Sequence, residues 1–357
     1  MEPTSAVTSR VRHCAGVVLG LLCAAGAALA AQVPSGDSAA QLFASQDVLH
    51  LTLEADFGQL RRDRSQDTEY RPGRISLNQP DGSVRTLDVK VKTRGIFRLR
   101  RDVCNFPPLR LNFRTREAAG TVFAGQDKLK LVVHCQDGRD EYEQYVLREY
   151  LAYRVHSLIT SFSFQVRLAR ITYLQTGETD SLTKYAFFIE DEEQMARRNG
   201  GTILDQKGVH QTEVDEGEAT LFSVFQYFIG NTDWKVSALH NVKLVLREGD
   251  PIPVAVAYDF DWSGAVDAEY AQPDRDLGTK SVRQRMYISP CRTQYDLSRA
   301  LALFMDSKDT IYNMYSEQVG FGEQSIRSSL EYFDEFYDIL ENPDAVRRVF
   351  VRSCPSA

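Results

Sequence analysis

The sequence predicts an α+β fold of two lobes, the first rich in β-strands and the second rich in helices. Short segments that alternate apolar and polar residues dominate the chain up to residue 189, as expected of half-buried strands. From residue 190 on, most apolar segments have the length and spacing of helices. A chain of 357 residues is also long for one hydrophobic core, which favours two lobes.

The first lobe combines several strands with one long helix. The turn sequence Gln79-Pro80-Asp81-Gly82-Ser83 predicts a hairpin between the strands that flank it. Glu141–Leu158 carries apolar and aromatic residues at roughly helical spacing, with charged residues between them, and is expected to be the helix. The expected strands are His50–Glu54, Arg74–Asn78, Arg85–Arg94, Leu109–Phe113, Lys128–Cys135, Arg167–Tyr173 and Lys184–Ile189.

The second lobe is expected to begin with an acidic loop, at residues 190–218. Thr220–Ile229 is a strongly apolar helix, and Gly230 is a natural residue to end it. Two strands follow, at Val242–Leu246 and Val254–Tyr258. The remaining expected helices are Tyr295–Asp306, Asp309–Gln318, Glu323–Leu340 and Ala345–Arg352.

These elements divide the chain into four parts. We expect a signal peptide at residues 1–30, a flexible lead-in at 31–46, a β-rich lobe at 47–189 and a helical lobe at 190–357. A β-rich lobe with one long helix, followed by a helix-rich lobe with a small central hairpin, is the layout of a two-lobed protein-kinase-like fold. That is the fold class we predict.

Four polar residues of the second lobe have the order that phosphoryl transfer needs. Asp233 lies in a loop, and Asn241 follows eight residues later at the start of a strand. Asp259 and Asp261 end the next strand, on one face of it. One carboxylate can orient an attacking hydroxyl, while an Asn and further carboxylates hold metal ions on the phosphates. We therefore predict Asp233 as the catalytic residue, and Asn241, Asp259 and Asp261 as ligands of Mg²⁺ or Mn²⁺. His240 is interpreted as a structural polar residue.

The chain resembles the CotH-type secreted kinases, the spore-coat CotH-like branch of the protein-kinase-like fold. The likeness covers most of residues 90–265. The segments that carry it are Lys92-Thr93-Arg94-Gly95 with Phe106–Leu111, Lys130–Val133 with Val146–Arg154, Tyr185–Glu190, Asn231-Thr232-Asp233 with His240-Asn241, and Tyr258-Asp259-Phe260-Asp261.

This resemblance implies a kinase that uses ATP with Mg²⁺ or Mn²⁺ and phosphorylates a protein or another hydroxyl-bearing acceptor. It also implies the residues that would contact the phosphates. Lys130 lies on a strand just ahead of the long helix, where kinases have their phosphate-pairing lysine, and Glu149 on that helix would be its partner. Pro107-Pro108 stands where the family has P-K-K, so Arg110 is a further candidate for binding phosphate.

The ends of the chain and its cysteines indicate export. Arg10 and Arg12, the apolar segment Val17–Leu22 and the site Ala28-Leu29-Ala30 have the order of a signal peptide that is cleaved near Ala30. We therefore expect a periplasmic or extracellular protein. Four cysteines remain after cleavage, and four cysteines allow three pairings. We favour Cys104–Cys135 and Cys291–Cys354, with buried free thiols as the alternative.

Charge and hydropathy exclude two classes of partner. The formal net charge of −7 argues against general binding of nucleic acid. Beyond the signal, no segment approaches about 18 uninterrupted apolar residues, so we expect no membrane span. The arginines between Arg94 and Arg116 are interpreted as a solvated loop face, with contact to phosphate or an acidic substrate as the alternative. No pattern predicts the oligomeric state.

Two other functions stay open. The first is a non-catalytic, pseudokinase-like protein of the same fold that acts as a scaffold in envelope or surface assembly. The second is a metal-dependent hydrolase that uses Asp259 and Asp261. Nucleotide binding would separate the kinase from the scaffold, and metal-dependent hydrolysis without nucleotide would favour the hydrolase.

Overall fold

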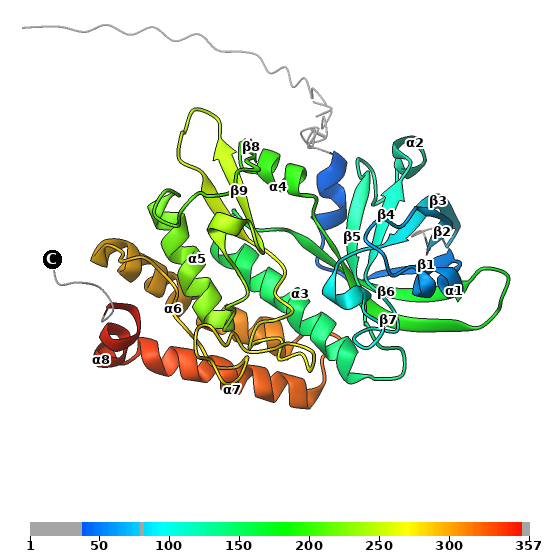
Figure 1. The fold of residues 1–357 in the computed structure, drawn as a ribbon. Coiled ribbons are helices and arrows are strands. Elements are labelled where there is room, and N and C mark those ends of the chain that lie inside the picture. The colour runs from blue at the N-terminus through cyan, green and yellow to red at the C-terminus, as the bar shows by residue number, and fades with distance from the viewer. Residues whose placement is uncertain (1–37, 79–81, 352–357) are drawn as a thin grey trace, which may run out of the picture. The chain divides into compact units, whose positions relative to one another are not determined.

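The strands of the first half of the chain close into a barrel. The computed structural model describes residues 38–78 and 82–351, and Figure 1 draws the barrel on its right-hand side. Neighbouring strands follow the order β1-β2-β3-β4-β5-β7-β6, and β6 returns to β1. The strands are β1 (Leu49–Ala55), β2 (Arg71–Asn78), β3 (Val84–Thr93), β4 (Leu109–Phe113), β5 (Lys128–Val132), β6 (Val166–Gln175) and β7 (Ser181–Ile189).

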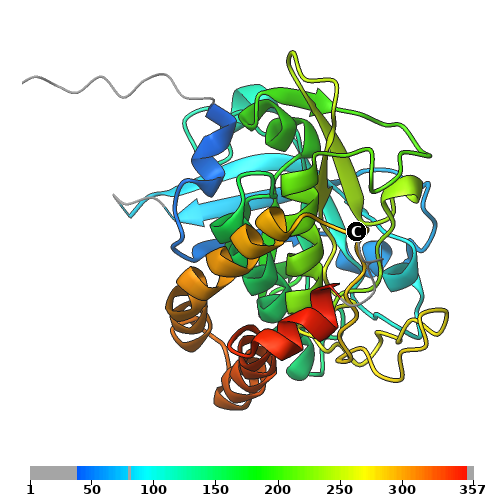
Figure 2. The same cartoon turned by 90° about the vertical axis from the view of Figure 1, so that its left-hand side faces the viewer.

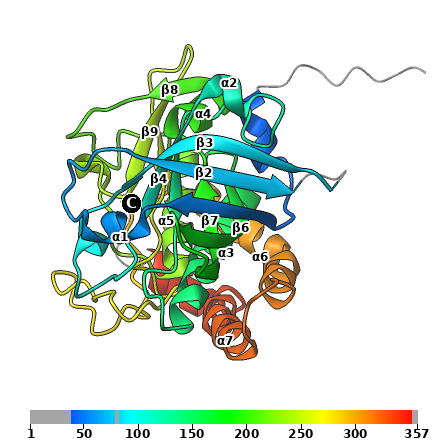
Figure 3. The same ribbon diagram turned by 90° about the vertical axis from the view of Figure 1, so that its right-hand side faces the viewer.

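The closed barrel shows that the predicted protein-kinase-like fold is wrong. Such a fold needs an open β-rich lobe, whereas here β1 pairs in parallel with β6, from Leu49 opposite Ala169 to Ala55 opposite Gln175. All other pairs of neighbouring strands in the barrel are antiparallel. Figure 3, which views this side of the molecule, shows β1, β2 and β3 running across the barrel. Closure leaves the sheet without exposed edges.

Strand alternation separates the barrel interior from its outer face. Leu109, Leu111 and Phe113 of β4 are buried in the interior, while Arg110 and Asn112 between them are only partly buried. Part of the expected flexible lead-in belongs to this core as well. A short 3₁₀ helix, η1 (Ser38–Phe43), contributes the buried side chains of Leu42 and Phe43.

The helices build a second, larger core against the outside of the barrel. Figures 1 and 2 show α3, α5, α6 and α7 gathered on this side. The long helix α3, which we assigned to the first lobe, packs into the same hydrophobic cluster as α5, α6 and α7. The helices are α1 (Phe57–Arg62), α2 (Thr115–Ala118), α3 (Glu141–Ile159), α4 (Glu192–Arg198), α5 (Glu216–Ile229), α6 (Gln294–Ser316), α7 (Glu323–Leu340) and α8 (Pro343–Val346).

Most expected elements are present, and the differences are local. The two helices expected between residues 295 and 318 form the single helix α6, and the end of the last expected helix is a π-helical turn at Arg347–Val351. The expected loop after residue 190 contains α4 and β8 (Gly201–Ile203). Strand β8 pairs with β9 (Val242–Arg247), which pairs with β10 (Val254–Ala257), so the predicted hairpin is part of a three-stranded sheet.

A disulfide joins Cys104 to Cys135, which confirms that predicted pairing. It ties the segment before β4 to the segment between β5 and α3. The predicted Cys291–Cys354 bond involves Cys354, and this residue lies outside the described part of the chain, as do residues 1–30, predicted as a signal peptide, and residues 79–81 of the predicted turn. Within the described residues, no helix is long and apolar enough to cross a membrane.

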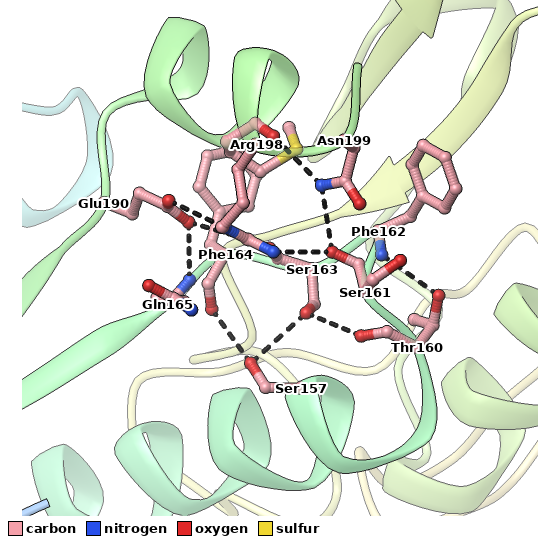
Figure 4. A network of polar contacts seen from close by, with 11 residues as sticks. Ser157, Thr160, Ser161, Phe162, Ser163, Phe164, Gln165, Glu190, Arg198 and Asn199 are labelled. Atoms are coloured by element: carbon pink, nitrogen blue, oxygen red, sulfur yellow. Dashed lines mark hydrogen bonds and ion pairs between the residues drawn. The ribbon is translucent and has the colours of Figure 1, made fainter. Parts of the chain in front are cut away.

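A buried carboxylate fixes α4 against the start of β6. Glu190 follows β7 and accepts two hydrogen bonds from Arg198 of α4, at 3.0 and 2.9 Å, and one from the backbone N–H of Gln165 at 2.9 Å. Arg198 also donates to the carbonyl oxygens of Ser161 and Ser163 (Figure 4). Because the Glu190 carboxylate and the Arg198 guanidinium each have several partners, the network stabilises one packing of α4 on the barrel.

We predict that the Cys104→Ser/Cys135→Ser double variant loses about 2–4 kcal/mol of unfolding free energy, because the open chain gains entropy when the bond is absent. Urea denaturation of the variant and of the wild type measures the difference. The wild type kept under a reducing agent is the control and should unfold like the variant. Equal stability of variant and oxidised wild type would contradict the prediction.

Candidate functional site

One cavity brings four of the predicted residues together. It has a volume of about 520 Å³ and lies among the loop after β3, the turn before β9 and the segment after β10. Asp233, Asn241, Asp259 and Asp261 all line it. The other lining residues are Arg94, Gly95, Ile96, Phe97, Arg98, Pro108, Leu239, His240, Tyr258 and Trp262.

Backbone pairing positions these residues. Since β9 and β10 are antiparallel, the residue before β9 adjoins the residue after β10, and the N–H of Tyr258 donates to the carbonyl of Asn241 at 3.1 Å. Helix α5 ends at Gly230, whose left-handed backbone starts the segment that carries Asp233. A Cβ atom at Gly230 would lie 1.9 Å from the Tyr332 hydroxyl oxygen, so this position requires glycine.

Both carboxylate oxygens of Asp233 have a partner. Oδ1 lies 2.8 Å from Nε2 of His240, and Oδ2 accepts a hydrogen bond from Nδ2 of Asn241 at 3.0 Å. The same amide nitrogen of Asn241 also donates to the carbonyl of Asp233 at 2.7 Å. This places His240, which we interpreted as structural, next to the predicted catalytic residue. Because the amide nitrogen of Asn241 is bonded to Asp233, the amide oxygen, Oδ1, is the atom of Asn241 that could bind a cation.

The backbone around the cavity is left-handed at three positions, which strains Leu239 more than Asn241 or Asp259. Leu239, Asn241 and Asp259 have φ angles of 53°, 51° and 63°, in the left-handed region that L-residues rarely adopt. The N–H of Asp259 is held by a hydrogen bond of 2.7 Å to the Tyr153 hydroxyl oxygen. Strain of this kind persists where the surrounding structure enforces it, and it clusters at functional sites.

Arg98 lies among three carboxylates beside the cavity. Its Nε is 3.4 Å from Asp261, its Nη2 is 3.6 Å from Asp259 and its Nη1 is 3.8 Å from Glu149. The side chains of Arg98, Glu149 and Asp261 are at most 9% exposed, whereas that of Asp259 is 37% exposed and faces the cavity. Sequence reasoning missed Arg98, because it belongs to the arginine-rich stretch that we interpreted as solvated.

Burial dominates the electrostatics of this cluster. It raises the pKa of Glu149 and that of Asp261 well above their ordinary values, and the positive charge of Arg98 offsets only part of the effect. In the described part of the chain, no group of three or more His, Cys, Asp or Glu side chains has the arrangement of a metal site. Here the Arg98 guanidinium takes up the space among the carboxylates.

A row of positive charges lies on the outer face of the barrel. Lys92 of β3, Arg110 of β4 and Lys130 of β5 are directly opposite one another in register. None of the three forms an ion pair within residues 38–78 and 82–351. The Lys130 ammonium lies 5.2 Å from the ring centre of Tyr258, which lines the cavity, so the row leads toward it.

The expected pair between Lys130 and Glu149 is not formed, because Glu149 pairs with Arg98 instead. Lys130 is largely buried, and this burial, together with the nearby charge of Arg94, lowers its pKa to about 8. Arg94, which belongs to the same arginine-rich stretch, is partly buried and lines the cavity, and its buried Nε atom has no hydrogen-bond partner. Lys130, Arg94 and Arg110 are therefore cations that a bound anion could pair with.

A second cavity adjoins the first at Asp233 and His240. It has a volume of about 560 Å³, and Thr232, Lys235 and Asp274 are among the residues that line it. The Asp233–His240 pair therefore lies at the border of the two cavities. Acidic and basic side chains line the first cavity, and polar and apolar side chains line the second.

Comparison with known proteins adds no relative. No family model matches the sequence, and no curated protein matches it. The resemblance to CotH-type kinases therefore stays a prediction based on the segments given above.

We predict that Lys130→Met stabilises the protein by about 1–3 kcal/mol at pH 7, because a buried ammonium is lost. The pKa of Lys130 is about 8 in the folded protein and near 10.5 when exposed. Between these values the unfolded chain binds more protons, so the stability of the wild type rises with pH and the advantage of the variant shrinks.

Urea denaturation at pH 7, 9 and 10.5 measures this trend. Lys128→Met is the matched control, since Lys128 is exposed on the same strand, and it should change the stability little at any pH. An advantage of Lys130→Met that stays constant with pH would count against the buried-ammonium explanation.

Proposed function

We propose that this protein transfers the terminal phosphoryl group of ATP to a hydroxyl-bearing acceptor, with Mg²⁺ or Mn²⁺. The observation that carries this proposal is that acidic side chains and cations lie around the same cavity, the first one described above. Asp233, Asn241 and Asp259 line it, and the cations Arg94 and Lys130 adjoin it. A metal–phosphate complex needs oxygen ligands for the metal and cations for the phosphate oxygens.

Asp259 and Asn241 are the residues that fit a metal ion. Asp259 offers a partly exposed carboxylate, and Asn241 has its amide nitrogen bonded to Asp233, so its oxygen remains for a cation. Hard divalent cations prefer such oxygen ligands. The metal would neutralise charge on the phosphates. Asp261 drops out of the predicted ligand set, since it is buried against Arg98.

Asp233 is suited to orient the acceptor hydroxyl. Its hydrogen bonds to His240 and Asn241 hold the carboxylate at the border between the two cavities. An acceptor in the second cavity would present its hydroxyl to Asp233, which takes the proton as the new P–O bond forms and ADP leaves. The acceptor is a protein or another hydroxyl-bearing molecule.

The disulfide Cys104–Cys135 supports an exported protein, because such bonds persist in oxidising compartments. We propose that the protein acts in the periplasm or outside the cell. The segments that resemble the CotH-type kinases support the activity, although the closed barrel departs from a kinase-like lobe.

One observation favours a second candidate. Arg98 pairs with Asp259 as well as with Asp261, and a carboxylate that is neutralised internally has less need of a metal ion. A non-catalytic scaffold in envelope or surface assembly would keep such a cluster for stability alone.

Thermal denaturation with ATP and Mn²⁺ separates the two. We predict that the melting temperature rises by roughly 3–8 °C when the nucleotide is at about 100 times its dissociation constant. The rise should require Mn²⁺ and be lost in Asp259→Asn, where asparagine tolerates the left-handed backbone that alanine would strain.

Asp306→Asn is the control for the lost charge, because Asp306 is exposed on α6 and lines neither cavity. It should keep the full rise. No rise in the wild type would reject the nucleotide site and leave the scaffold. A rise that persists in Asp259→Asn would reject Asp259 as the metal ligand.

A further inference from the structure

We propose that the outer face of strands β3, β4 and β5 is a docking surface for an acidic segment of a partner protein. Four cations form this surface, which is called the basic face below: Lys90 and Lys92 of β3, Arg110 of β4 and Lys128 of β5. The inference concerns binding alone. It therefore goes beyond the proposed function and applies equally to an enzyme and to a scaffold.

The basic face consists of two rows of side chains across neighbouring strands. Lys92 lies opposite Arg110 in the first row, and Lys90 and Lys128 lie on either side of Asn112 in the second. Lys90 and Lys128 are exposed, while Lys92 and Arg110 are partly buried. Like charges directly opposite one another destabilise a sheet. A partner that brings negative charge to the first row would relieve this repulsion.

The chain itself supplies little negative charge to these four cations. Among the residues that the structure describes, Lys90, Lys92 and Arg110 form no ion pair, and Lys128 has its exposed neighbour Asp127 at 3.7 Å. The Nε atom of Arg110 is buried and has no hydrogen-bond partner. The positive charge of the basic face is therefore available to another molecule.

A cavity beside the second row gives a docked segment more than charge to contact. It has a volume of about 450 Å³, and Lys90 and Asn112 are among the residues that line it. The two acids in its wall, Glu54 and Asp88, pair with Arg74 at 3.2 and 4.0 Å. These acids are therefore partly neutralised already, and the Asn112 amide can donate to and accept from the backbone of a peptide.

The spacing of the lysines fits an extended peptide. Lys90 and Lys92 are alternate residues of one strand, so their Cα atoms lie ~7 Å apart on the same face. An extended peptide has the same repeat, so carboxylates at every second position can meet the two rows in turn. Matching opposite charges across an interface in this way gives specificity and speeds association.

Charge density favours an acidic protein segment over nucleic acid. The formal net charge of the chain is −7, so the protein as a whole repels polyanions. A peptide with a carboxylate at every second residue carries one charge per ~7 Å, whereas double-stranded DNA carries one per ~1.7 Å. The ring of Tyr70, beside the basic face, is also already in contact with the Lys92 ammonium, which lies 5.1 Å from the ring centre.

The test is the binding of a fluorescent peptide of alternating Glu and Ser residues, measured by anisotropy without nucleotide or metal. We expect the wild type to bind it and to lose affinity as salt is added. Lys90→Glu/Lys92→Glu should raise the dissociation constant by about tenfold, because two attractive contacts become repulsive. The new carboxylate at position 92 would lie opposite Arg110, which favours folding of this variant.

Two controls accompany this variant. Lys280→Glu/Arg299→Glu changes the net charge by the same amount at exposed positions outside the barrel, and it should keep the wild-type affinity within about twofold. If Lys90→Glu/Lys92→Glu does not fold, as circular dichroism would reveal, Lys90→Gln/Lys128→Gln replaces it. That variant changes exposed side chains alone and should weaken binding by about threefold.

Several outcomes would overturn the inference. One is equal binding of a peptide in which Gln replaces Glu, and another is an equal loss of affinity in the control variant. Tighter binding of a single-stranded oligonucleotide would assign the basic face to nucleic acid instead. A wild-type dimer in sedimentation that the variant loses, without peptide binding, would assign it to a second copy of the chain.

Discussion

The buried guanidinium of Arg98 is the constraint on which the rest of the site depends. Glu149 lies on α3, Asp259 and Asp261 follow β10, and Arg98 lies between β3 and β4, so one cation connects the barrel to both neighbours. Carboxylates that are buried without a cation cost several kcal/mol each. The cluster therefore fixes where Asp259 lies, and with it the acidic wall of the cavity.

The outer face of the barrel beside the cavity has a different electrostatic character. Lys92, Arg110 and Lys130 face one another in register on neighbouring strands, and like charges in that arrangement destabilise a sheet. Burial lowers the pKa of Lys130 to about 8, so the side chain is still mainly charged at pH 7 and the repulsion remains. A row of cations beside partly exposed acids is what a metal–phosphate ligand would neutralise, and this complementarity is the main support for a phosphotransferase.

The β3–β4 connection links the barrel to the acidic side of the cavity. The barrel closes where β6 returns to β1, and the long β3–β4 connection extends from it with Arg94 and Arg98. The disulfide at Cys104 and the aromatic contacts of Phe97 hold that connection in place. On the other side, three left-handed residues, Leu239, Asn241 and Asp259, shape the turns that carry the acidic groups.

The sequence by itself determined the local features of this protein. Alternation and helical spacing identified most strands and helices, and the bond between Cys104 and Cys135 was the favoured one of the possible pairings. The chain order of Asp233, Asn241 and Asp259 was enough to group them as candidates, and all three line one cavity.

Only the tertiary structure decided the closure of the barrel and the role of Arg98. Closure depends on pairing residue 49 with residue 169, and periodicity within a segment carries no information about a partner so far along the chain. The sequence of an arginine-rich stretch also does not indicate whether its side chains are solvated or buried. Which arginine is buried depends on where carboxylates from distant elements converge, and that convergence is a property of the folded chain alone.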